Sequence, residues 1–153
     1  MTDPLAARSL LFAPGDSERK LAKAGASEAD LVLLDLEDAV AEANKPAARA
    51  LVAGHLKTAA RAQPQWVWIN PLDTPHALPD LAAIVPGAPD GIMLPKATRA
   101  EADLLHHYLT ALEAAHGLPQ GGIRTIVVAT ETAPAIFGLG DYAGCPRLAA
   151  LTW

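Results

Sequence analysis

Residues 125–131 read Thr-Ile-Val-Val-Ala-Thr-Glu, a short apolar run that ends in a single carboxylate. Its hydrophobicity is continuous rather than alternating, which is typical of a strand buried on both faces in a parallel sheet covered by helices. Five further apolar runs recur along the chain, at residues 9–13, 31–36, 66–70, 91–95 and 148–153. The sequence therefore predicts six strands.

A longer and more polar segment follows each of the first five runs, and this strand–helix rhythm predicts the α/β fold class. One helix-start signal is the spacing of Thr98 and Glu101, which fits a capping box. The first expected helix begins after Asp16 or Ser17. Four more are expected at residues 43–62, 80–85, 98–117 and 136–142. These elements are too few for a complete (β/α)₈ barrel of about 250 residues, and an open doubly wound sheet stays possible because spacing does not give strand order.

Composition narrows the class of protein. The chain has 153 residues, 51% of them hydrophobic, which is enough for one core, and its net charge of −5 leaves no basic stripe for nucleic acid. Cys145 is the single cysteine, so no internal disulfide forms, and residues 1–4 do not resemble a signal peptide. No apolar run reaches the about 20 residues that a membrane span requires. We expect a cytoplasmic protein without nucleic-acid or membrane partners.

Polar residues stand at the ends of five predicted strands. In α/β proteins, ligands bind outside the carboxyl ends of parallel strands, so residues gathered there are candidates for a functional site. Strand ends are commonly polar for other reasons, but five together favour a site. These residues are Asp16, the segment 35–38, Asn70, Lys96 and Glu131.

Glu131 and the Glu37–Asp38 pair suggest a hard cation, because carboxylate oxygens suit Mg²⁺. For Asp38 a plainer role is favoured, as a helix cap or a partner of Lys45. Lys96 either holds a phosphate or carboxylate as a point charge or, if desolvated, forms a Schiff base. The five histidines show no metal-binding spacing, and we expect them to be solvated.

Taken in order, these motifs resemble the citrate lyase β-subunit-like branch of the HpcH/HpaI aldolase family. The resemblance extends over essentially the whole chain, and its strongest part is the RSLLFAPG opening followed by the LDLEDAV string. The matching segments are Arg8–Gly15, Leu34–Val40, Ile69–Pro71, Leu94–Lys96, Thr130–Ala133 and Leu151–Trp153.

The resemblance implies a (β/α)₈ TIM barrel, of which residues 1–153 supply about the first six strands and five helices as the N-terminal portion of one domain. It also implies Mg²⁺ and a coenzyme A thioester substrate. In the family, a Glu at the end of the fifth strand and an Asp just after the sixth hold the metal. Glu131 matches the first, and the second is expected after Trp153.

One position departs from the family pattern. Members typically carry an arginine two residues before the Asn of the third strand, and Trp68 stands there instead, without the charged fork that binds a carboxylate. We predict Glu37 and Lys96 as catalytic residues and Glu131 as the metal ligand. Predicted substrate-binding residues are Arg8, Lys20, Lys45, Trp68 and Asn70.

The leading hypothesis is a Mg²⁺-dependent carbon–carbon lyase or aldolase that acts on citryl-, malyl- or citramalyl-CoA, with these 153 residues alone a poor catalyst. One alternative is a non-catalytic or truncated barrel that serves as a subunit or binding module. A further alternative is a 2-oxo acid aldolase without a CoA site. Unpaired strand edges invite self-association, so we also expect a homo-oligomer.

Overall fold

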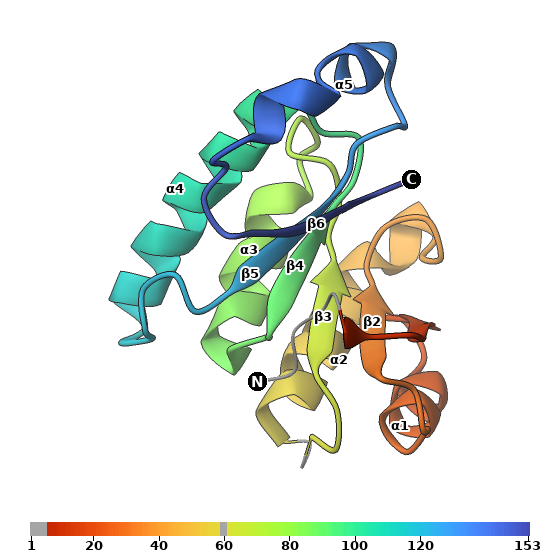
Figure 1. The fold of residues 1–153 in the computed structure, drawn as a ribbon. Helices are drawn as coiled ribbons and strands as arrows, with labels where there is room; N and C mark the ends of the chain where they lie inside the picture. The colour runs from red at the N-terminus through yellow and green to blue at the C-terminus, as the bar shows by residue number, and fades with distance from the viewer. Residues whose placement is uncertain (1–5, 59–60) are drawn as a thin grey trace.

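Six parallel strands form one sheet in the computed structural model, which describes residues 6–58 and 61–153 (Figure 1). Each strand begins within one residue of the start of the run that predicts it. The strands are β1 (Leu10–Pro14), β2 (Leu31–Asp35), β3 (Gln65–Trp68), β4 (Gly91–Leu94), β5 (Arg124–Val128) and β6 (Leu148–Thr152). The prediction of six strands is confirmed.

The strand order is sequential, because each strand pairs in parallel with the next one in the chain. A doubly wound sheet would reverse direction at a switch point, so this alternative is excluded. The helices α2 (Lys45–Thr58), α3 (Ala77–Ile84) and α4 (Arg99–Ala115) cover one face of the sheet (Figure 1). This arrangement is that of the first six strands of a (β/α)₈ barrel, as predicted.

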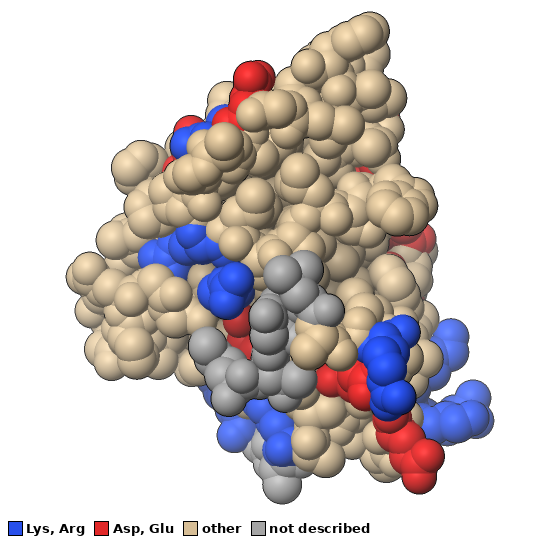
Figure 2. Space-filling model, in the orientation of Figure 1, with Lys and Arg blue, Asp and Glu red and all other residues tan. Residues whose placement is uncertain are grey.

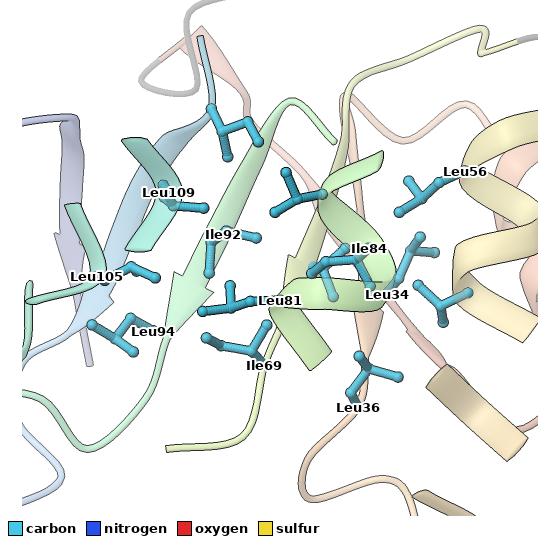
Figure 3. Close-up of a cluster of buried hydrophobic side chains, with 14 of the residues drawn as sticks. Leu34, Leu36, Leu56, Ile69, Leu81, Ile84, Ile92, Leu94, Leu105 and Leu109 are labelled. Carbon is cyan, nitrogen blue, oxygen red and sulfur yellow. The ribbon is translucent and has the colours of Figure 1, made fainter. Parts of the chain in front are cut away.

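Two apolar layers line the two faces of the sheet. Alternate residues of each strand point to opposite faces, so Val67 and Ile69 pack in the outer layer beneath the helices, whereas Trp66 belongs to the inner layer. The outer layer is the larger and joins the sheet to α2, α3 and α4 (Figure 3). The inner layer consists of Leu31, Leu33, Trp66, Met93, Ile126, Val128 and Ala149.

The first strand differs from the prediction that strands are buried on both faces. Leu10, Leu11 and Phe12 of β1 are 38%, 39% and 50% exposed, because β1 stands at the end of the sheet with β2 as its one partner strand in the described chain. Charged side chains occupy separate patches on the face shown in Figure 2, and uncharged residues cover most of it.

Most helix signals are confirmed. Ser17 caps α1 (Glu18–Gly25) by accepting a bond from the backbone N–H of Lys20, and Glu101 accepts one of 2.8 Å from Thr98 at the start of α4. The third helix begins at Ala77, three residues earlier than predicted. The fifth predicted helix divides into α5 (Ala133–Phe137) and a 3₁₀ turn over residues 139–142.

The second helix is shorter than predicted. A 3₁₀ turn over residues 42–44 precedes α2, and residues 61–62 are not helical, although the prediction extended to Ala62. Arg61 turns back instead and donates a bond of 2.8 Å to the carbonyl oxygen of Leu56, which satisfies an open acceptor at the helix end. Residues 59–60, which the predicted helix includes, lie outside the described residues. Within the described chain, no helix is long and apolar enough to cross a membrane.

Candidate functional site

Three of the predicted site residues meet at the carboxyl end of the sheet. Lys96, which follows β4, joins the other two: its ammonium group pairs with Glu37 Oε1, and its backbone N–H donates a bond of 2.8 Å to Glu131 Oε2. Asp38 lies beside this group, with Oδ1 at 3.9 Å from the Lys96 Nζ. We refer to Glu37, Asp38, Lys96 and Glu131 as the rim cluster.

Lys96 adopts an unusual backbone conformation, with a φ of 51° in the left-handed region. A residue with a Cβ is strained there, and such strain is found most often at functional sites. Its hydrogen bond to Glu37 raises the pKa of the Lys96 ammonium, so the side chain stays protonated near neutral pH. Of the two roles considered for Lys96, the geometry therefore favours the point charge over the Schiff base.

Glu37 is a buried carboxylate whose two oxygens are both engaged. Oε1 pairs with Lys96, and Oε2 accepts a bond of 2.6 Å from the indole N–H of Trp68. The Trp68 ring in turn lies beside Phe12, with ring centroids 5.5 Å apart. Glu37 therefore fixes the position of one charged and one aromatic side chain.

The turn that carries Glu37 is built by Asp35 at the end of β2. The Asp35 carboxylate accepts bonds from the backbone N–H groups of Glu37, at 2.7 Å, and Ala39, at 3.3 Å. Burial raises the pKa of this carboxyl group against the effect of those two bonds. Asp35 thus holds the turn that positions Glu37 in the rim cluster.

Lys45 and Asn70, which are predicted to bind substrate, are buried beneath the rim cluster. Lys45 is 8% exposed, and its ammonium group donates to the carbonyl oxygens of Leu36 and Glu37, both at 3.1 Å, and to Asn70 Oδ1 at 2.7 Å. Lys45 therefore does not pair with Asp38, and its contacts hold the backbone of the β2 end.

Asp80 and Arg49, which were not predicted as site residues, complete this network. Asn70 donates through its amide to Asp80 Oδ2 at 2.7 Å, and Asp80 Oδ1 accepts from Arg49 at 2.9 Å. Asp80 is 1% exposed and lies on the same buried face of α3 as Leu81 and Ile84. The sequence signal that could have identified Asp80 is its position as a charged residue on the apolar face of a helix.

Arg8 and Lys20 are not brought to the rim cluster. Arg8 precedes β1 at the amino end of the sheet, where it contacts Asp30 through its guanidinium at 3.5 Å. Lys20 lies in the first turn of α1 and lines a hollow of about 250 Å³ beside β1, together with Lys23. Their predicted roles in substrate binding remain predictions.

The carboxylate of Glu131 suits one position around Mg²⁺. The side chain is exposed, and its Oε2 accepts a hydrogen bond from the backbone N–H of Lys96. Mg²⁺ typically takes one or two protein carboxylates and fills its other positions with water and substrate oxygens. No group of three or more His, Cys, Asp or Glu side chains that could hold a metal occurs in the described part of the chain.

The prediction that all histidines are solvated is wrong for His106. Its Nδ1 accepts a bond of 3.0 Å from Arg147, whose guanidinium also makes two bonds to the buried carboxylate of Glu113. This group joins α4 to the start of β6 at the amino end of the sheet. It stabilises the fold at a distance from the rim.

Known proteins resemble this chain over nearly all of its length. A model of the HpcH/HpaI aldolase/citrate lyase family matches residues 8–152. A (3S)-malyl-CoA thioesterase of Cereibacter sphaeroides is 37% identical over 94% of the chain and 47% of its own length. The citrate lyase subunit beta of Haemophilus influenzae is 35% identical over 78% of the chain and 42% of its own length.

Solved structures that resemble the chain include members of the same group of proteins. The Mycobacterium tuberculosis citrate lyase beta subunit, in complex with oxaloacetate and magnesium, matches 97% of the chain with a TM-score of 0.72 and 34% identity. The chain covers 58% of that structure. The CitE protein of the same organism, in complex with magnesium, acetoacetate and coenzyme A, has a TM-score of 0.71 and 33% identity, over 97% of the chain and 49% of its own. The chain spans about half the length of these relatives.

Proposed function

The chain belongs to the HpcH/HpaI aldolase/citrate lyase family, and on this premise we propose that its rim cluster forms part of the active site of a Mg²⁺-dependent carbon–carbon lyase. The substrate would be the coenzyme A thioester of a hydroxy acid, of the citryl-, malyl- or citramalyl-CoA type. The observation that supports the proposal most strongly is the contact of one lysine, Lys96, with carboxylates that follow two different strands.

Glu131 is the residue that would hold the metal, because its side chain is exposed and its carboxylate is anchored at the rim through Oε2 by the backbone N–H of Lys96. Bound Mg²⁺ would supply Lewis-acid stabilisation of the negative charge that develops on an enolate oxygen. The Lys96 backbone N–H orients the Glu131 carboxylate toward this role.

Lys96 would stabilise negative charge on the substrate. Its ammonium stays protonated because Glu37 accepts a hydrogen bond from it, and it is partly exposed at the rim, where a thioester or carboxylate oxygen can approach. Glu37 has both oxygens occupied by donors, so its proposed part is to orient Lys96 rather than to remove a proton.

Coenzyme A carries phosphates, and Lys20 is better placed than Arg8 to bind them. Lys20 follows the carboxyl end of β1 in the first turn of α1, whereas Arg8 lies at the amino end of the sheet beside Asp30. A lysine binds phosphate as a point charge, which needs no fixed geometry.

A direct test incubates the protein with Mg²⁺ and malyl-, citramalyl- or citryl-CoA and measures acetyl-CoA and the 2-oxo acid. We expect both products in equal amounts, and Glu131→Gln should remove the activity. Glu28→Gln is a matched control, since Glu28 is an exposed glutamate ahead of β2 at the other end of the sheet. Product formation that is unaffected by Glu131→Gln would contradict the proposal.

A second candidate is thioester hydrolysis, because the relative from Cereibacter sphaeroides bears the name malyl-CoA thioesterase. The same assay separates the two reactions. Hydrolysis releases free coenzyme A and the intact hydroxy acid, whereas the lyase reaction leaves the thioester bond in acetyl-CoA. Free thiol without a 2-oxo acid would favour the hydrolase.

We also propose a homo-oligomer, since the apolar side chains of Ile136, Phe137 and Leu139 are exposed on α5 and the turn that follows it. Light scattering after size-exclusion chromatography would give the mass, and a monomer at all concentrations would contradict this part of the proposal.

A further inference from the structure

Trp68 and Phe12 form an aromatic surface next to the rim cluster, which we refer to as the aromatic patch. Trp68 is the last residue of β3 and pairs with Asp35 at the end of β2, so its indole lies at the carboxyl end of the inner layer. Phe12 is half exposed and meets Trp68 at an interplanar angle of 53°. The patch therefore lies at the opening of the inner layer, beside Glu37.

The patch differs from ordinary core packing. Trp66, two residues earlier on the same strand and face, is 2% exposed within the inner layer, whereas Trp68 is only partly buried. Gly91 on the neighbouring strand makes room for the Trp66 ring, because a Cβ there would come within 2.5 Å of it. The structure thus buries one tryptophan within the inner layer and leaves the other partly exposed at the carboxyl end of that layer.

The patch has no free hydrogen-bond donor for an anion. Indole has a single donor, its N–H group, and in Trp68 that group is bonded to Glu37 at 2.6 Å. The rim cluster beside it contains three carboxylates, Glu37, Asp38 and Glu131, and one cation, Lys96, which the proposed function assigns to a thioester or carboxylate oxygen of the substrate. A second carboxylate placed against the Trp68 ring would lie beside the Glu37 carboxylate, and the indole N–H, which is bonded to Glu37, could not compensate the repulsion.

We propose that the aromatic patch binds the alkyl or aryl substituent of a 2-oxo acid that carries a single carboxylate. This inference rests on the proposed lyase function and narrows its substrate class: the thioester would bear an apolar substituent on the hydroxylated carbon rather than a second acidic arm. Burial of alkyl carbon against the two rings supplies the binding energy, and the carboxylates of the rim disfavour an acidic arm.

Calorimetric titration of the protein in the presence of Mg²⁺ tests the inference with four probes: pyruvate, 2-oxobutyrate, 2-oxopentanoate and oxaloacetate. We expect the affinity to rise about twofold to fourfold with each added methylene group. Oxaloacetate should bind more weakly than pyruvate, because it adds a carboxylate where the others add apolar carbon.

Two substitutions separate the ring from its N–H group. Trp68→Phe keeps an aromatic ring and should retain most of the dependence on chain length, whereas Trp68→Ala should remove it. Phe12→Ala, which leaves the bond between Trp68 and Glu37 in place, should weaken the dependence as well. Far-UV circular dichroism of each variant identifies any that fails to fold, and Trp68→Phe then still tests the inference.

The outcomes distinguish this inference from the proposed function. Equal affinities for pyruvate, 2-oxobutyrate and 2-oxopentanoate, or tightest binding of oxaloacetate, would overturn the inference, and binding that requires Mg²⁺ and Glu131 would still support the lyase. A rise in affinity with chain length that is the same without Mg²⁺ would support the patch and count against the lyase. Absence of binding by all four probes would contradict both.

Discussion

The backbone N–H of Lys96 donates a hydrogen bond of 2.8 Å to Glu131 Oε2, which ties the residue after β4 to the residue that follows the end of β5. The left-handed backbone of Lys96, with a φ of 51°, accompanies the simultaneous contact of its ammonium with Glu37. One residue therefore connects the ends of three strands.

This backbone conformation can be tested with a pair of variants that both lack the ammonium group. Lys96→Gly should be more stable than Lys96→Ala by about 1 kcal/mol, because glycine adopts a left-handed φ without the steric cost of a Cβ. Urea denaturation at neutral pH measures both free energies of unfolding. Equal stabilities, or a more stable alanine variant, would show that the position is not strained.

The strands could be predicted because their signal is local. A run such as residues 91–95 is apolar throughout, and burial on both faces of a parallel sheet requires that composition. The strand order was not predictable from spacing. The observed end of α2 differs from the predicted one, because a side chain beyond the helix bonds to its last turn. That side chain belongs to Arg61.

Lys45 should contribute strongly to stability. Lys45→Met would leave the carbonyl oxygens of Leu36 and Glu37 and the Asn70 side chain without their shared donor, in a region that excludes water. We expect a loss of about 3 kcal/mol, because a buried acceptor left without its donor costs about 1–3 kcal/mol. The measurement is again urea denaturation.

Lys23→Met is the matched control for this substitution, because Lys23 is an exposed lysine on α1. Its free energy of unfolding should stay within about 0.5 kcal/mol of the parent protein. If the two variants lose equal stability, the network around Lys45 does not have the structural importance that its geometry indicates.

The buried ion pair of Glu113 and Arg147 gives the stability a dependence on pH. Burial alone would raise the pKa of Glu113, but the bonds from Arg147 and from the backbone N–H groups of Ile123 and Gly121 outweigh it and lower the pKa. A carboxyl group with a lowered folded-state pKa stabilises the protein above its unfolded pKa of about 4.3, and this stabilisation is lost as the pH falls through the folded value.

Acid titration of the free energy of unfolding checks this. The parent protein should lose stability as the pH falls below about 4.3. Glu113→Gln should be less stable at neutral pH and should show a shallower decline on acidification, since it has no carboxyl group to protonate there. Parallel curves for the two proteins would contradict the assignment.

Only some residues of the candidate site could be predicted from the sequence. Glu37, Lys96 and Glu131 could be identified because each follows a strand, and parallel strands place their ends at one edge. Asn70 also follows a strand, and Lys45 lies at the start of the next helix after β2. Their side chains meet beneath the rim cluster, and spacing along the chain does not reveal this orientation. The buried Asp80 and the partly buried Arg49 were missed because their contact joins residues of two helices that are 31 positions apart in sequence.

The most direct test of the central claim is a calorimetric Mg²⁺ titration of the protein and its Glu131→Gln variant in the presence of pyruvate. The account predicts that the parent protein and the Glu28→Gln control bind Mg²⁺ and that Glu131→Gln loses at least tenfold in affinity, about 1.4 kcal/mol. Unchanged Mg²⁺ affinity in Glu131→Gln, or no Mg²⁺ binding by the parent protein, would contradict it.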